Sequence, residues 1–221
     1  MKANRDPAQE TARSNGVPKV YTPEAINDLP LRRYGGAIHL IRSHDEMLEA
    51  LAQLRQESVL GFDTETRPAF QKGTRFSPAL LQLAGQSGVY LFQINRIGFN
   101  EELAAYLADE SILKAGVGLD YDIRQLNKLC KFKPGSFLDV SSEARQLGMK
   151  KVSLRSLAAS FLGFRISKSA KCSNWAVADL KQSQIRYAAT DAWVSREIYL
   201  SMYSQGFVRT SRFLDAPKSD C

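Results

Sequence analysis

The chain has 221 residues, of which 44% are hydrophobic and 24% charged, and its formal net charge at pH 7 is +7. This length predicts one ordinary domain with a substantial core and excludes two large ones, and the composition is typical of a soluble globular protein. We find no apolar run of about 18 residues that would cross a membrane and no secretory signal pattern, while three scattered cysteines predict a reducing, cytoplasmic location.

The predicted elements begin after a polar segment, residues 1–35, which contains four prolines and is expected to lie outside the core as an extension. Strands are expected at residues 37–41, 58–64, 79–84, 89–92, 114–117 and 137–140. Helices are expected from residue 43 or 44 to 54, and over residues 101–108, 120–130, 153–161 and 180–203. Strands that then alternate with helices predict an α/β domain over residues 36–205, a mixed sheet with helices on both faces, followed by a tail at residues 206–221.

Four carboxylates occur in three separate segments of the sequence. Asp63 and Glu65 lie at the end of the apolar run that begins at residue 58 and share one face of a strand, with Thr64 on the other. On the last helix, Tyr187 and Asp191 are four residues apart and also share a face. Acidic groups at the end of a buried strand are costly unless they are neutralised, and Mg²⁺ and Mn²⁺ prefer oxygen ligands. The pattern therefore predicts a divalent-metal site.

The remaining carboxylate stands at the start of a predicted helix, where Asp120 and Asp122 compete for the role. An anion is favoured there by the helix dipole, so either residue could also be a simple cap without chemistry. We favour Asp122 because Leu126 and Leu129 follow it at helical spacing and would set it beside the packed stripe.

Three segments resemble the exonuclease motifs of the DEDD superfamily, a likeness that covers roughly residues 36–205. They are Gly-Phe-Asp-Thr-Glu at 61–65, Gly-Val-Gly-Leu-Asp-Tyr-Asp-Ile-Arg-Gln-Leu at 116–126, and Gln-Ile-Arg-Tyr-Ala-Ala-Thr-Asp-Ala at 184–192. Further matches lie at 79–84, 137–139, 153–157 and 171–175, whereas Thr66 replaces an aromatic residue that relatives often carry. The resemblance implies a ribonuclease H-like fold and 3′-to-5′ hydrolysis of nucleic acid.

The branch of the superfamily depends on one position. Histidine-type relatives carry histidine five residues before the last aspartate, where this chain has Arg186. Tyrosine-type relatives carry tyrosine four residues before it, as Tyr187 is here, so the chain is similar to the branch that contains ribonuclease D and the exonuclease domain of the Werner syndrome protein.

A two-metal mechanism with Mg²⁺ or Mn²⁺ assigns each acidic residue a role. Asp63 is expected to bridge the two ions, Glu65 and Asp191 to hold the ion that activates the attacking water, and Asp122 to hold the other ion, largely through waters. Tyr187, whose ordinary pKa is near 10, is a poor base at neutral pH and is expected to orient the water, unless it only packs.

The basic segment 150–186 contains eight Lys or Arg residues and one acid, Asp179. It is either a solvated face or a surface for nucleic acid. The candidate nucleic-acid contacts are Thr64, Lys168, Lys171, Asn174 and Trp175. Core packing is the alternative for Trp175, and base stacking or packing are both open for Phe70 and Phe76.

The substrate is expected to be the 3′ end of DNA or RNA, and we favour DNA because the segment 171–175 is similar to the Werner-like branch. Two alternatives stay open. One is an RNA-processing exonuclease of the ribonuclease D type, and the other is a catalytically silent ribonuclease H-like module that binds nucleic acid. The presence of all four carboxylates and Tyr187 argues against the silent module.

Overall fold

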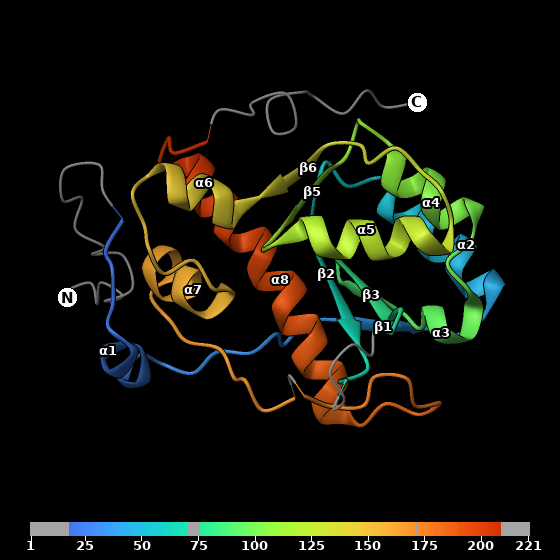
Figure 1. Cartoon of the computed structure of the whole chain (residues 1–221), viewed down its shortest axis with the longest axis horizontal. Coiled ribbons are helices and arrows are strands. Elements are labelled where there is room, and N and C mark those ends of the chain that lie inside the picture. Colours follow the sequence, from blue (N-terminus) through green and yellow to red (C-terminus); the bar gives the residue numbers. More distant parts are fainter. Residues whose placement is uncertain (1–17, 70–75, 171, 209–221) are drawn as a thin grey trace, which may run out of the picture.

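The computed structural model describes residues 18–69, 76–170 and 172–208 of the chain. These residues form a mixed sheet with the strand order β1-β4-β3-β2-β5-β6 (Figure 1). The strands are β1 (Ile38–Ile41), β2 (Val59–Thr66), β3 (Pro78–Ala84), β4 (Val89–Phe92), β5 (Leu113–Gly116) and β6 (Phe137–Asp139). β2 pairs antiparallel with β3 and parallel with β5, β3 pairs antiparallel with β4, and the two outer pairs are parallel. The predicted mixed α/β sheet is confirmed.

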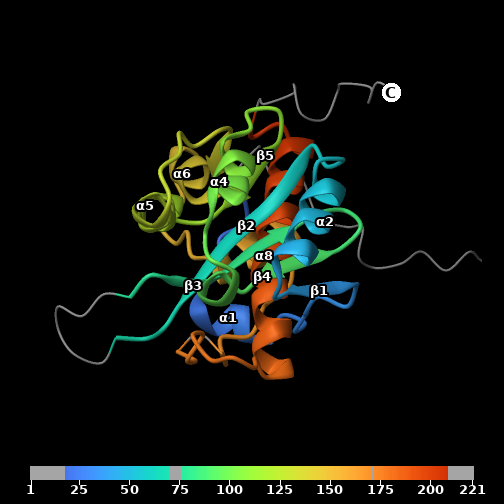
Figure 2. The ribbon, with the colours of Figure 1, turned by 90° about the vertical axis from the view of Figure 1, so that its right-hand side faces the viewer.

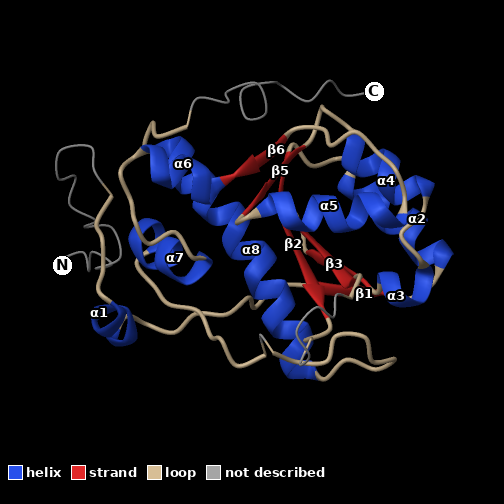
Figure 3. Cartoon of the chain, in the orientation of Figure 1, coloured by secondary structure: helices blue, strands red, loops and turns tan. Residues whose placement is uncertain are grey.

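Helices cover both faces of this sheet. They are α1 (Pro23–Asp28), α2 (His44–Leu54), α3 (Ile94–Ile97), α4 (Glu101–Ala108), α5 (Leu119–Leu129), α6 (Val140–Gln146), α7 (Leu154–Leu162) and α8 (Gln182–Ser204). The long helix α8 lies along one face, with α6 and α7 beside it, whereas α2, α4 and α5 lie on the other (Figures 1 and 3). Within the described ranges, none of the helices has the length and apolar character needed to span a membrane.

Local sequence signals set the helix starts. Ser43 caps α2 by accepting a hydrogen bond from the Glu46 backbone at 3.2 Å, and the Glu46 carboxylate accepts one from the Ser43 backbone at 3.1 Å. Ser153 caps α7, and its hydroxyl accepts a hydrogen bond from the Ser156 backbone at 3.3 Å. Leu129, which was expected on a packed stripe, is exposed instead and retains 41% of its accessible surface.

The long strand β2 crosses the molecule (Figure 2) and contacts helices on both faces of the sheet, α8 on one and α5 on the other. Leu60 and Phe62 point into the core beneath α2, α4 and α5, so the alternate positions face α8. One of these is Gly61, where an added Cβ would stand 1.8 Å from the carbonyl oxygen of Ala192. Glycine therefore lets the backbone of α8 approach β2 closely enough to place the end of the strand beside the helix.

Residues 18–35 differ from the predicted extension outside the core. Thr22 caps α1, whose first residue is Pro23, and Ile26 is buried with 5% of its surface exposed. Leu31 then pairs with Arg165 in an isolated parallel bridge. The four prolines suggested an irregular arm, but a capped helix start and this long-range pairing fix the segment to the domain.

Two further differences concern short elements. Residue 140 was expected to end a strand but begins α6, because Asp139 caps that helix through a 2.8 Å bond from the Ser141 backbone. In the predicted C-terminal tail, Phe207 lies 6.0 Å from Phe161 between ring centroids, and Val208 is buried. The first residues of the tail thus pack on the core.

Candidate active site

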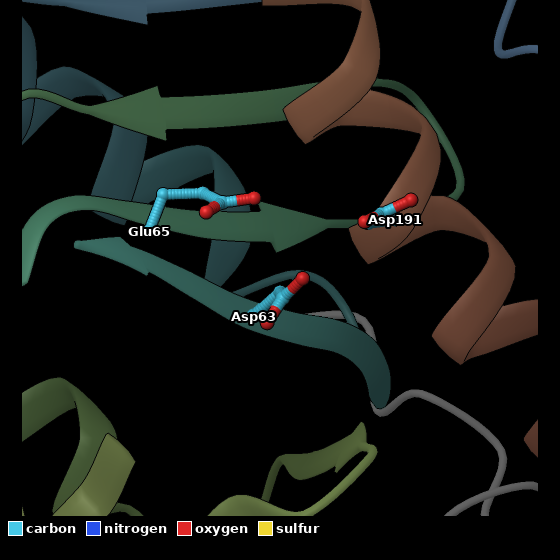
Figure 4. Close-up of side chains that lie close together, drawn as sticks. All are labelled: Asp63, Glu65 and Asp191. Atoms are coloured by element: carbon cyan, nitrogen blue, oxygen red, sulfur yellow. The ribbon is translucent and has the colours of Figure 1, made fainter. Parts of the chain in front are cut away.

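Three of the predicted carboxylates meet where the end of β2 passes α8. Asp63, Glu65 and Asp191 each offer one carboxylate oxygen, and these atoms all lie within 4.8 Å of one another. Figure 4 shows the two side chains of β2 across from Asp191 on α8. The strand alternation and the close approach at Gly61 therefore bring together residues that are far apart in the sequence.

The electrostatics of this cluster favour a bound cation. Desolvation raises the pKa of Asp63 well above its usual range, and the nearby charges of Asp191 and Asp122 raise it further. The Thr64 backbone N–H donates to Asp63 Oδ1 at 2.9 Å and opposes this shift. Oxygen donors that repel one another in a desolvated site fit a hard divalent ion such as Mg²⁺ or Mn²⁺.

Asp122 stands beside this cluster, on the side of the sheet that α5 covers. The hydroxyl of Thr64 donates to Asp122 Oδ1 at 2.7 Å. Desolvation raises the pKa of Asp122 to about 6, and this hydrogen bond limits the rise. The competing residue Asp120 is exposed on α5, so of the two aspartates it is Asp122 that lies beside the cluster.

Thr64 consequently connects the two groups of carboxylates. Its backbone N–H holds Asp63, its hydroxyl holds Asp122, and the residue is only 9% exposed. The side chain that was predicted to contact nucleic acid is therefore engaged with Asp122.

Tyr187 lies next to Asp191 on α8, one turn earlier. Desolvation raises its pKa above the usual 10, and the charges of Asp191 and Glu65 and a hydrogen bond to Asp191 raise it further. The phenol therefore stays protonated at neutral pH and acts as a hydrogen-bond donor. Its ring also packs 6.0 Å from that of Trp175, so the residue both packs and reaches the carboxylate cluster.

The other predicted nucleic-acid contacts are spread along the segment before α8. Trp175 has 0% of its surface exposed and belongs to the core between α8, β3 and β4, which agrees with core packing, the alternative left open for this residue. Asn174 is exposed and its side chain accepts from the Ala176 backbone at 3.1 Å, which holds a turn. Lys168 is exposed, whereas Lys171 lies outside the described residues, as does Phe70.

A residue that the sequence analysis left out lies beside the cluster. Gln82 pairs with Asp63 across β2 and β3, so the two side chains share the face under α8. It is fully buried, and among the described residues its carboxamide has no hydrogen-bond partner. In the sequence it is a single amide inside the apolar run Ala79–Ala84, one of the segments that resemble the DEDD superfamily.

The mixed sheet, and the carboxylates that cluster where its central strand meets a packed helix, agree with the ribonuclease H-like fold expected from the sequence. The family model for 3′-5′ exonuclease matches residues 38–206, and the chain belongs to this family. This membership confirms the resemblance to the DEDD superfamily.

Relatives over the same region include two mammalian proteins. The mouse bifunctional 3′-5′ exonuclease/ATP-dependent helicase WRN is 34% identical over an alignment of 160 positions, which covers 70% of this chain and 11% of that protein. The human exonuclease mut-7 homolog is 29% identical over an alignment of 212 positions, which covers 79% of this chain and 23% of that protein. The chain thus spans only a small part of these curated relatives.

Solved structures show the same fold. The Nibbler EXO domain of Aedes aegypti has a TM-score of 0.71 and 25% identity, and the match covers 79% of this chain and 92% of that one. Escherichia coli RNase D has a TM-score of 0.68 and 20% identity, and the match covers 80% of this chain and 48% of that one.

Proposed function

We propose that this chain is a metal-dependent exonuclease that hydrolyses phosphodiester bonds from the 3′ end of nucleic acid. The observation that carries the proposal is the meeting of Asp63, Glu65 and Asp191 from two elements, in a chain that belongs to the 3′-5′ exonuclease family. A catalytically silent module would not need to keep this repulsive arrangement, which costs folding free energy.

Two divalent ions would be held by the four carboxylates, Asp63 between them, Glu65 and Asp191 at one and Asp122 at the other. When bound, such ions supply an activated water and neutralise charge that develops on the phosphate. Asp122 is poised by Thr64, whose 2.7 Å hydrogen bond fixes the direction of the carboxylate. The other oxygen of the Asp122 carboxylate stays available for the ion and its waters.

Tyr187 is proposed to orient the attacking water. Its protonated phenol beside Asp191 is a donor close to the carboxylates that would hold the activated water. A hydrogen bond that positions a nucleophile contributes more in the transition state than in the ground state.

For the substrate we favour DNA, and RNA is the second candidate. The preference rests on the similarity of residues 171–175 to the Werner-like branch, and the WRN protein is among the relatives. Lys168 is exposed just ahead of this segment and is proposed to contact a phosphate.

We also propose that the protein works in the cytoplasm, the location expected from its few cysteines.

Parallel digestion of three end-labelled substrates tests the proposal. Single-stranded DNA, duplex DNA with a recessed 3′ end, and RNA of the same sequence are incubated with Mg²⁺ or Mn²⁺. We expect stepwise shortening of DNA at a higher kcat/KM than RNA. Faster digestion of RNA would overturn the preference for DNA, and an intact set of substrates would overturn the enzymatic proposal.

A further inference from the structure

A cavity of about 220 Å³ lies on the side of α8 next to the carboxylate cluster. Tyr187 and Asp191 form part of its wall, so it opens directly beside the residues proposed to act on the scissile phosphate. Three arginines, Arg32, Arg33 and Arg186, also line it, and we call it the arginine cavity.

Two of these arginines come from a segment that is fixed at several points. The Arg32 backbone donates to the Arg165 carbonyl at 2.9 Å, and the Arg165 backbone donates to the Pro30 carbonyl at 2.9 Å. The Tyr34 backbone donates to the Thr190 hydroxyl on α8 at 3.0 Å. The strap formed by residues 30–34 is thus bound on both sides of Arg32 and Arg33, which holds their backbone in place beside α8.

The charge of the arginine cavity is positive. Its three arginines face a single lining acid, Asp191. In the part of the chain that the structure describes, Arg32, Arg33 and Arg186 form no ion pair. All three are exposed, so their guanidinium groups are available to an anion that enters from solvent.

The hydroxyl groups that line the arginine cavity and the volume of the cavity indicate which class of ligand it can bind. Ser167 and Ser169 line the same cavity, with their oxygens 2.9 Å apart, and hydroxyls together with guanidinium groups are the usual donors to phosphate oxygens. The volume of about 220 Å³ is below the roughly 300–1,000 Å³ of pockets that enclose a whole small molecule. The cavity therefore suits a phosphate with the edge of its sugar.

We propose that the arginine cavity binds one backbone phosphate of the nucleic-acid strand, next to the phosphate that is cleaved. The inference rests on the proposed exonuclease function and adds a substrate-positioning site to it. Arg32 and Arg33 precede residues 38–206, the region that the family model matches, so the strap adds two of the three arginines to a site whose residues outside the strap lie within that region. The strap thereby has a role in substrate binding as well as in packing.

The double variant Arg32→Gln/Arg33→Gln tests this proposal against Lys131→Gln/Lys133→Gln. The control also removes two positive charges, but from exposed positions after α5 that do not line the cavity. Steady-state cleavage of a single-stranded oligonucleotide is measured with Mn²⁺, and equilibrium binding of the same oligonucleotide is measured in EDTA over a range of salt. Thermal melting checks that both variants fold.

For the cavity variant we expect KM to rise about ten- to a hundredfold with kcat changed less than about threefold, because charge-assisted bonds to a phosphate are lost. The salt slope of log Kd should fall by about one, and the control should move neither value comparably. Equal effects of the two double variants on binding would overturn the arginine cavity as a phosphate site. Absence of cleavage by the wild-type protein would instead overturn the proposed function, and the binding measurement in EDTA would still decide on the cavity.

Discussion

Replacing Asp63 with asparagine should abolish cleavage and, in the metal-free protein, raise stability. The oxygens of Asp63, Glu65 and Asp191 lie within 4.8 Å of one another. At that distance and an effective dielectric constant of about 20, two like charges repel by about 3 kcal/mol. Because the wild-type protein relieves part of this repulsion by protonating Asp63, we expect Asp63→Asn to gain about 1–3 kcal/mol at pH 8, a rise in Tm of about 3–10 °C for a chain of this length.

The gain should depend on pH in a defined direction. The folded state raises the pKa of Asp63 above its ordinary 3.8, so it binds that proton more tightly than the unfolded state does. The resulting stabilisation is complete below pH 3.8 and is lost as the pH rises through the raised folded value. The difference between variant and wild type should therefore be small at pH 4 and grow towards pH 8.

Calorimetric melting in EDTA, repeated with Mg²⁺, is the assay. Saturating Mg²⁺ should stabilise the wild-type protein and should affect Asp63→Asn far less, because a ligand that binds only the folded state raises its stability. If Asp63→Asn is less stable than wild type at pH 8 in EDTA, or if the difference does not vary with pH, the electrostatic reasoning is refuted.

The remaining predictions concern the residues around the carboxylates. Tyr187→Phe keeps the ring packing and every carboxylate, so single-turnover rates should fall about ten- to a thousandfold at a nearly constant KM, and wild-type rates would reduce the residue to packing. Thr64→Val removes the donor that limits the pKa of Asp122, so the acidic limb of the pH–rate profile should move upward, whereas Thr64→Ser should leave it in place. Trp175→Phe should lower the free energy of unfolding by about 1–3 kcal/mol because the residue is fully buried. The Kd for an oligonucleotide should not change. A large rise in Kd with unaltered stability would instead show that Trp175 contacts nucleic acid.

Most of the sheet could be predicted because its sequence signals are local. The apolar run before Asp63, the turn between β3 and β4 and the cap at Ser43 each follow from a few neighbouring residues. The face on which Asp63 and Glu65 lie follows from strand alternation alone. Their meeting with Asp191 could be inferred only through the likeness to a family, since the contact depends on how closely α8 approaches Gly61.

The contacts that the sequence did not predict are long-range. Thr64 was predicted to contact nucleic acid. The hydrogen bond from its hydroxyl to Asp122, 58 positions later, could not be predicted from a local sequence pattern. The strap at residues 30–34 was expected to lie outside the core. The backbone hydrogen bonds that hold it reach Arg165 and Thr190, which are far away in the sequence, so no local pattern predicts them. Trp175 follows a segment of polar residues but packs beneath α8, where burial depends on the whole fold.

One measurement tests the central claim most directly: digestion of a 5′-labelled single-stranded oligonucleotide, with a free or a blocked 3′ end, by wild type and by Asp191→Asn. With Mg²⁺ or Mn²⁺ the wild-type protein should produce a ladder of products shortened from the free 3′ end, and the blocked substrate, excess EDTA or Asp191→Asn should each stop it. Undiminished digestion by Asp191→Asn, or a full ladder in excess EDTA, would contradict the assignment of this carboxylate cluster as a metal-dependent exonuclease centre.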